Sequence, residues 1–200
     1  LAVLQAISEV PRHLFVPASV RHRAYEDSAL PIGRGQTISQ PFVQARSIEA
    51  ARIRGDDKVL EVGTGSGYQT ALLARLASVV FSVERIETLA RGAREALAQA
   101  GVRNISVLVG DGTLGWRPYA PYDAIIVAAA SPTVPAPLIE QLAPGGRLII
   151  PIGDRETQVL MLYEKNAEGE MSRGKEVSDV RFVPLLGQFG FHPSTENHVL

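Results

Sequence analysis

The chain has 200 residues, 46% of them hydrophobic, which is enough to bury a core and favours one domain over residues 1–200. A formal net charge of −1 gives no footprint for nucleic acid or an anionic membrane surface, so we expect neither partner. The sequence has no cysteine, which excludes disulfides, thiolate metal sites and a cysteine nucleophile and is compatible with the reducing cytoplasm, where we expect the protein. No apolar run reaches the roughly 18 residues of a membrane-spanning helix.

Residues 1–54 predict a helical leader that packs on the rest of the chain. Its first apolar residues recur at helical spacing, at Leu1, Leu4, Ile7 and Val10. Because the sequence opens inside this pattern and without methionine, we expect the natural protein to have residues before Leu1. Near its end the leader carries an unusually long polar stretch, RGQTISQPF over 34–42, just ahead of an apolar helix.

Residues 55–152 alternate between strand and helix. Short, continuously apolar runs rich in β-branched residues predict strands buried on both faces, at 59–62, 79–83, 105–109 and 124–128. Helical patterns lie over 69–77, 87–100 and 136–142. This alternation is typical of βαβ units, so we expect a doubly wound α/β fold whose mostly parallel sheet has helices on both faces.

Residues 153–200 change this pattern. The segments 157–164 and 176–185 alternate like strands, and the turn-rich sequence 166–170 joins them. They predict an antiparallel pair at the edge of the sheet. The tail 189–200 matches no pattern to which we can assign a role.

The stretch VLEVGTGSGYQT, residues 59–70, runs from strand through glycine loop to helix, which predicts a nucleotide-like ligand. Tyr68 stands where the dinucleotide fingerprint has its third glycine, which counts against NAD. Glu61 would be a poor neighbour for a pyrophosphate and a good one for a cation. The alternative is a tight turn without a ligand. The loop residues expected to touch the ligand are Gly63, Thr64, Gly65, Ser66 and Gly67.

Two further carboxylates support this cofactor site. Glu84 ends the second strand, where it could accept hydrogen bonds from both ribose hydroxyls, and Asp111 follows the third strand, where it could accept an adenine amino proton. Either acid alone could be only a turn residue at a strand end. Together with Glu61 they indicate adenosine that carries a cationic group, which fits S-adenosylmethionine. We include the neighbouring Arg85 and Gly112 in the same site.

Several segments, in this order, resemble the motifs of class I S-adenosylmethionine-dependent methyltransferases: VLEVGTGSGYQTALLA, SVERI, GDG, YDAIIVAAA and LAPGGRLIIPIG. ALPIGRGQTISQP, with EVPRHLFVP before it and VRFVPLL near the end, resembles the protein-L-isoaspartate O-methyltransferases, over Ile7 to Leu186. The resemblance implies a Rossmann-like fold. It also implies repair of damaged proteins and peptides: the α-carboxylate of an L-isoaspartyl residue becomes a methyl ester that collapses to a succinimide, and D-aspartyl residues are a further candidate substrate.

The resemblance also assigns roles to residues. The polar loop within residues 1–54 would fold over the bound cofactor and substrate. Ser39 would sit by the reactive methyl, and Thr37, Ser39 and the main chain at Gln40 would hold the acceptor carboxylate. Val183, Pro184 and Leu185 would receive the peptide, although an edge strand is the alternative for them. Because an α-carboxyl group, with a pKa of about 3.5, is already ionised at neutral pH, Ser39 is expected to orient the acceptor and no general base is needed. Capping the next helix is the alternative role for Ser39.

Other residues and functions have been weighed in the same way. We expect Asp27 to order the polar loop. We expect Trp116 and Tyr119 to close a satellite aromatic cluster, and lining the adenine site is the alternative for them. The four histidines show no metal-ligand spacing, so no metal is expected. Besides the carboxyl methyltransferase, two functions stay open: a methyltransferase for a small molecule or RNA, and an adaptor that binds cofactor and damaged peptides without catalysis. We expect the protein to be a monomer.

Overall fold

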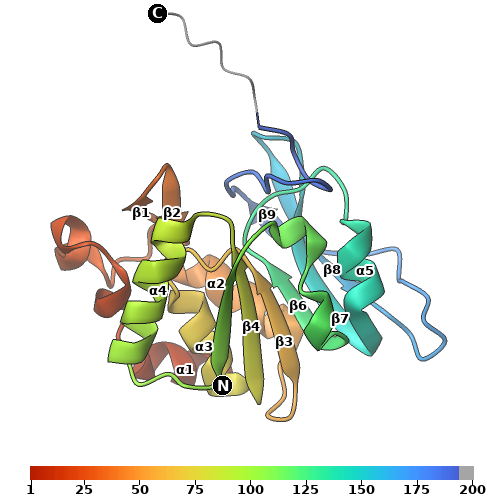
Figure 1. Cartoon of the computed structure of the whole chain (residues 1–200), viewed down its shortest axis with the longest axis horizontal. Coiled ribbons are helices and arrows are strands. Elements are labelled where there is room, and N and C mark those ends of the chain that lie inside the picture. The colour runs from red at the N-terminus through yellow and green to blue at the C-terminus, as the bar shows by residue number, and fades with distance from the viewer. Residues whose placement is uncertain (194–200) are drawn as a thin grey trace, which may run out of the picture.

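The computed structural model describes residues 1–193, and His198 lies outside the described residues. A seven-stranded sheet forms its centre (Figure 1). From edge to edge the strands are β5 (Ile105–Val109), β4 (Val79–Glu84), β3 (Lys58–Val62), β6 (Tyr122–Val127), β7 (Leu142–Gly153), β8 (Gln158–Glu164) and β9 (Lys175–Val180). The first five strands pair in parallel, whereas β8 and β9 pair antiparallel, so the predicted sheet with an antiparallel edge is confirmed.

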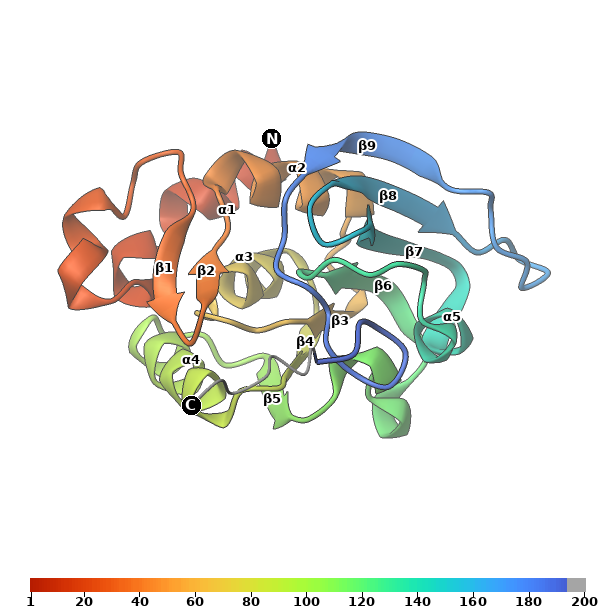
Figure 2. The ribbon, with the colours of Figure 1, turned by 90° about the horizontal axis from the view of Figure 1, so that it is seen from above.

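Helices cover both faces of the sheet (Figure 2). One face packs against α2 (Pro41–Ala51), α3 (Tyr68–Leu76) and α4 (Glu87–Gln99), and the other against α5 (Ala136–Gln141). Val59 and Leu60 show why β3 is apolar throughout: they are adjacent, fully buried, and belong to core clusters on opposite faces. No helix in the described part of the chain has the length and apolar character needed to cross a bilayer.

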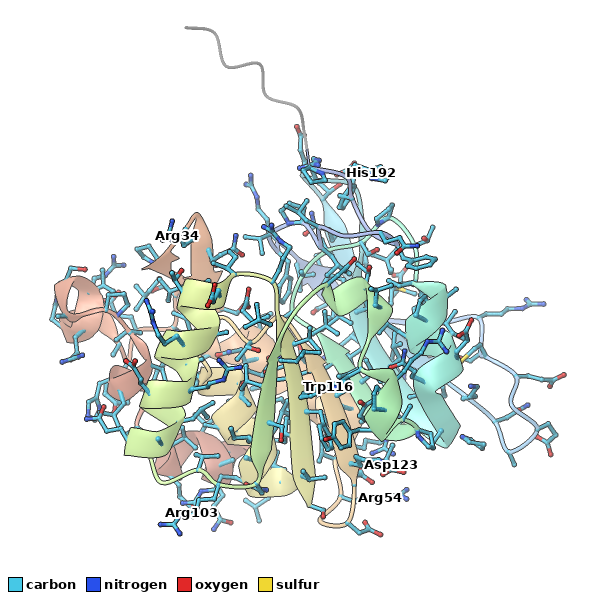
Figure 3. The ribbon with its side chains drawn as sticks, in the orientation of Figure 1. Arg34, Arg54, Arg103, Trp116, Asp123 and His192 are labelled. Carbon is cyan, nitrogen blue, oxygen red and sulfur yellow. The ribbon has the colours of Figure 1, made fainter. Side chains whose placement is uncertain are left out.

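The leader contains helices, as expected, and also a β-hairpin that the sequence did not predict. After α1 (Ala2–Glu9) and two 3-10 turns, β1 (Leu30–Gly33) pairs antiparallel with β2 (Gln36–Ile38). Gly33, Arg34 and Gly35 form the turn with φ angles of 92°, 57° and 69°, and Arg34 stands at its tip (Figure 3). Strands of four and three residues are too short to give a periodic signal in the sequence.

The chain leaves the sheet edge earlier than expected. β9 ends at Val180, whereas the sequence pattern continues to residue 185. The Gln158 side chain accepts the Phe182 N–H at 2.8 Å, and the chain then crosses the sheet to pair with Ala130 just past β6. The Ala130 N–H donates to the Val183 carbonyl at 2.8 Å, and the Leu185 N–H donates to the Ala130 carbonyl at 2.7 Å. The crossing carries residues 183–185 to the carboxyl ends of the parallel strands.

The edge strand β9 carries charged side chains. Lys175, Glu176 and Asp179 are exposed along it, and its pairing with β8 shifts register between Leu160 and Met161. β9 is therefore irregular in its pairing and charged.

A buried ion pair fixes the carboxyl end of α2. The guanidinium of Arg147, in β7, donates to the carbonyls of Ala51 at 2.8 Å and Arg52 at 3.0 Å, and it pairs with the carboxylate of Asp57. The side chains of Arg147 and Asp57 are only 5% and 6% exposed. Arg147 thus satisfies two helix-end carbonyls and ties α2 to the turn that precedes β3.

Candidate active site

A pocket lies at the carboxyl ends of β3, β4 and β6, where open α/β sheets bind ligands. Most of the predicted site residues line it: Thr37, Ser39, Gly63, Thr64, Gly65, Ser66, Glu84, Arg85, Gly112, Val183, Pro184 and Leu185. A second pocket adjoins the first and is lined by Gln40 and Phe182 among others. Both pockets share Thr37, Ser39, Ala128 and Val183, so Ser39 stands where the two meet.

The glycine loop between β3 and α3 shapes one wall of the first pocket. Gly63, Gly65 and Gly67 have φ angles of 94°, 53° and 87°, a left-handed region that favours glycine. The Glu84 carboxylate accepts the Gly65 N–H and the Ile86 N–H, each at 2.9 Å. These two bonds hold Glu84, which is 7% exposed, at the wall of the pocket.

Three predicted cofactor residues, Glu61, Gly67 and Asp111, do not line this pocket. Asp111 accepts the Thr113 N–H at 2.9 Å and the Thr113 hydroxyl at 2.7 Å, and its other oxygen accepts the Gln188 N–H at 2.8 Å. The segment after Leu185 therefore crosses directly over Asp111. A Cβ at Gly187 would lie 2.1 Å from Asp111 Oδ1, so this crossing requires a glycine. An adenine contact of Asp111 stays a prediction.

The start of α2 is held by Asp27. The helix begins after Gln40 and has no side-chain cap of its own, and within residues 1–193 the Ser39 hydroxyl makes no hydrogen bond. Capping by Ser39 is thus not observed. Asp27 Oδ1 accepts the Phe42 N–H at 3.0 Å, and Oδ2 accepts the Gln40 side-chain amide at 2.9 Å. These bonds confirm that Asp27 orders the polar loop, and they lower the pKa of its carboxyl.

Comparison with known proteins places the chain in a family. A sequence model described as protein-L-isoaspartate(D-aspartate) O-methyltransferase matches residues 1–190. The chain belongs to this family. Two relatives named protein-L-isoaspartate O-methyltransferase come from Methanoculleus marisnigri and Pseudomonas aeruginosa. The first is 57% identical, over 94% of this chain and 85% of the relative's length. The second is 56% identical, over 92% of this chain and 87% of the relative's length.

Solved structures agree with this assignment. A protein-L-isoaspartate O-methyltransferase superposes with a TM-score of 0.82 at 29% identity, over 94% of this chain and 62% of its own length. A putative protein-L-isoaspartate O-methyltransferase from Plasmodium falciparum, in complex with S-adenosyl-L-homocysteine, gives a TM-score of 0.79 at 26% identity, over 92% and 90%. The isoaspartate methyltransferase family therefore accounts for both the sequence motifs and the fold of this chain.

Sequence reasoning missed two polar residues of this family member. Arg12 is 2% exposed, and it donates to the Gln44 side chain at 3.0 Å and to the Ser39 carbonyl at 3.1 Å. Gln44 in turn lines the first pocket. The segment EVPRHLFVP was used only for its resemblance, although an arginine among apolar residues, which is rarely buried without partners, was a usable signal.

The aromatic residues after Asp111 lie apart from the pocket. Trp116 and Tyr119 pack on Phe81 with ring centroids 5.4 and 4.4 Å away, and Trp116 stands beside the sheet, far from Arg34 at the hairpin tip (Figure 3). The predicted satellite cluster is confirmed. Within residues 1–193, no group of three or more acidic or histidine side chains is placed to hold a metal ion.

Glu61 forms a buried polar cluster beneath the glycine loop. Its carboxylate is fully buried and accepts hydrogen bonds from Thr70 at 2.5 Å, Ser82 at 2.6 Å and Gln69 at 3.3 Å. Burial raises the pKa of Glu61 to about 7, against these hydrogen bonds, which lower it. Glu61 therefore supports the loop from behind. It is buried and does not line the pocket, which argues against the predicted direct contact with a cationic group.

Glu61→Gln is expected to change how stability depends on pH. Because the folded state holds the Glu61 proton more tightly than the unfolded state, its contribution to stability is complete below pH 4.5 and is lost as pH rises through about 7. Relative to the variant, the wild type should lose about 3 kcal/mol of unfolding free energy across this range. Urea unfolding of both proteins at several pH values measures this difference. Parallel pH profiles would contradict the assignment.

Proposed function

We propose that this chain transfers the methyl group of S-adenosylmethionine to the free α-carboxylate of L-isoaspartyl residues in damaged proteins and peptides. The observation that carries the proposal is the position of Ser39 at the junction of two pockets. One pocket is bounded by the glycine loop and Glu84, and the other by Gln40 and Phe182. A transfer between two bound molecules needs such a junction, because the reacting groups must be held together in a fixed orientation.

The first pocket fits S-adenosylmethionine. Glu84 presents a fixed carboxylate suited to ribose hydroxyls, and the open main chain of the glycine loop suits a close ligand. Val83 and Ile86 add apolar surface beside them. Arg85 and Gly112 complete the proposed site, with Asp111 as the acceptor for the adenine amino group. When bound, S-adenosylmethionine supplies an electrophilic methyl group.

The residues around the second pocket align the acceptor. An α-carboxylate is ionised at neutral pH, so the protein has no proton to remove. We assign Thr37, Ser39 and the Gln40 N–H to hold its oxygens, and Val183, Pro184 and Leu185 to receive the peptide. Once the carboxylate is a methyl ester, the neighbouring amide nitrogen attacks its carbonyl, loses its proton and expels methanol. The resulting succinimide reopens with water to aspartyl or isoaspartyl.

We also propose that the protein acts on isoaspartyl proteins as a monomer. The proposed compartment is the cytoplasm, with which a chain that lacks cysteine is compatible.

Two peptides of identical sequence, one with an aspartyl and one with an isoaspartyl linkage, test the function. With methyl-labelled S-adenosylmethionine, only the isoaspartyl peptide should be labelled well, because it alone offers a free α-carboxylate. The label should leave as methanol in mild alkali, since the product is an ester. Equal labelling of both peptides, or an alkali-stable product, would point to another methyltransferase. Binding without labelling would favour the adaptor.

Ser39→Ala is expected to lower the rate of methyl transfer about tenfold, the worth of roughly one hydrogen bond, because the hydroxyl would orient the acceptor. The affinity for S-adenosylmethionine should stay near that of the wild type. Thermal stability should stay too, because within residues 1–193 no hydrogen bond of the Ser39 hydroxyl is lost. Steady-state kinetics and thermal unfolding check both parts. A rate loss fully accounted for by a lower melting temperature would remove the assigned role.

A further inference from the structure

Arg12 is a buried cation without a buried anion beside it. Its side chain bonds to the Gln44 amide oxygen and to the carbonyls of Ser39 and Ser28, and its guanidinium lies 4.9 Å from the centre of the Tyr68 ring. Its Nε has no hydrogen-bond partner, and within residues 1–193 no carboxylate lies at ion-pair distance from it. A buried charge without an opposite charge lowers the stability of the fold. This arrangement therefore points to a role for Arg12 at the pocket.

The bond from Arg12 to the Ser39 carbonyl fixes the direction of the next N–H. In a planar trans peptide, the carbonyl of one residue and the N–H of the following residue point in opposite directions. The Gln40 N–H is therefore held pointing away from Arg12, and within residues 1–193 no group accepts it. The next two residues offer no alternative donor, since Pro41 has no N–H and the Phe42 N–H is taken by Asp27.

We propose that Arg12 is a positioning residue for the acceptor carboxylate. It holds the Ser39–Gln40 peptide so that the Gln40 N–H donates to that carboxylate, and its charge, acting through the polarised peptide, favours an anion there. This inference rests on the proposed function. It explains why the cation lies directly behind the loop that carries Ser39.

The test compares two ligands on the protein loaded with S-adenosylhomocysteine. One is an isoaspartyl peptide, and the other is the same peptide with its α-carboxylate converted to a carboxamide. The wild type should bind the carboxylate form better. In Arg12→Met this preference should fall about tenfold, the size of one hydrogen bond to a charged group. Arg12→Lys should lose less of this preference, because lysine keeps the positive charge. It should still lose part of it, because lysine cannot bridge Gln44 and the Ser39 carbonyl.

A purely structural role for Arg12 would weaken both peptides alike and leave their ratio unchanged. Arg147→Met is the matched control: it also removes a buried arginine that holds two carbonyls, but away from both pockets, so it should lower stability and keep the preference. Binding of S-adenosylhomocysteine verifies that each variant is folded. The proposal would be overturned if Arg12→Lys, and Arg12→Met where it folds, kept the preference for the carboxylate peptide within about twofold of the wild type. A wild type without any preference would overturn the proposed function with it.

Discussion

Asp57→Ala is expected to lower the free energy of unfolding by about 3–5 kcal/mol, because it leaves the guanidinium of Arg147 buried without its counter-charge. The guanidinium would keep its bonds to the carbonyls of Ala51 and Arg52, but those bonds do not neutralise it. Urea unfolding at neutral pH measures the change.

The ion pair between Arg52 and Glu164 provides the control for this prediction. Its side chains are 56% and 50% exposed, and exposed pairs are screened by solvent, so Glu164→Gln should change stability by less than about 1 kcal/mol. An Asp57→Ala variant no less stable than Glu164→Gln would show that the buried pair contributes nothing beyond an exposed one.

Glu84→Ala is expected to weaken S-adenosylmethionine binding about 10- to 150-fold, which corresponds to about 1.5–3 kcal/mol for hydrogen bonds to a charged group. The variant also removes the acceptor for the Gly65 N–H, which ties the glycine loop to the end of β4, and for the Ile86 N–H. Calorimetric titration measures the dissociation constant.

Glu87→Ala is the matched control for Glu84→Ala. Glu87 is an exposed glutamate at the start of α4, three residues after Glu84, and it lies outside the lining of the pocket. Its removal should leave the dissociation constant within about twofold, because a surface substitution away from the site changes little. Unchanged affinity in both variants would remove Glu84 from the cofactor site.

Four of the five parallel strands could be predicted because each carries its own apolar signal, and β7 was not among them. The expectation that residues 105–109 are buried on both faces is wrong, because β5 lies at the edge of the sheet and is only partly buried. Residues buried on both faces must be apolar, and runs such as 59–62 show this without knowledge of their neighbours. The same holds for the glycine loop, since the left-handed φ angles of Gly63, Gly65 and Gly67 require the residue type that the sequence displays. Local rules therefore located the glycine-loop and Glu84 side of the pocket, whereas Thr37, Ser39 and residues 183–185 were assigned through the family resemblance.

Features that depend on distant partners could not be predicted. The start of α2 is held by Asp27, 15 residues before Phe42, where local capping rules pointed to Ser39. Gln158 ends β9 by taking the Phe182 N–H, a contact between residues 24 apart in sequence. Glu61 was expected at the ligand because it ends a strand, but its side chain points toward α3, as the bond to Thr70 shows. The side on which a strand-end residue lies is decided by packing.

The charged edge strand β9 affects how this protein interacts with partly unfolded substrates. Damaged chains that have partly unfolded expose unpaired strands, and these add readily to any flat, apolar sheet edge. Lys175, Glu176 and Asp179, together with the irregular pairing to β8, make β9 a poor template for such addition. A repair enzyme with such an edge can bind and release many misfolded proteins, even at high concentration, without nucleating their aggregation.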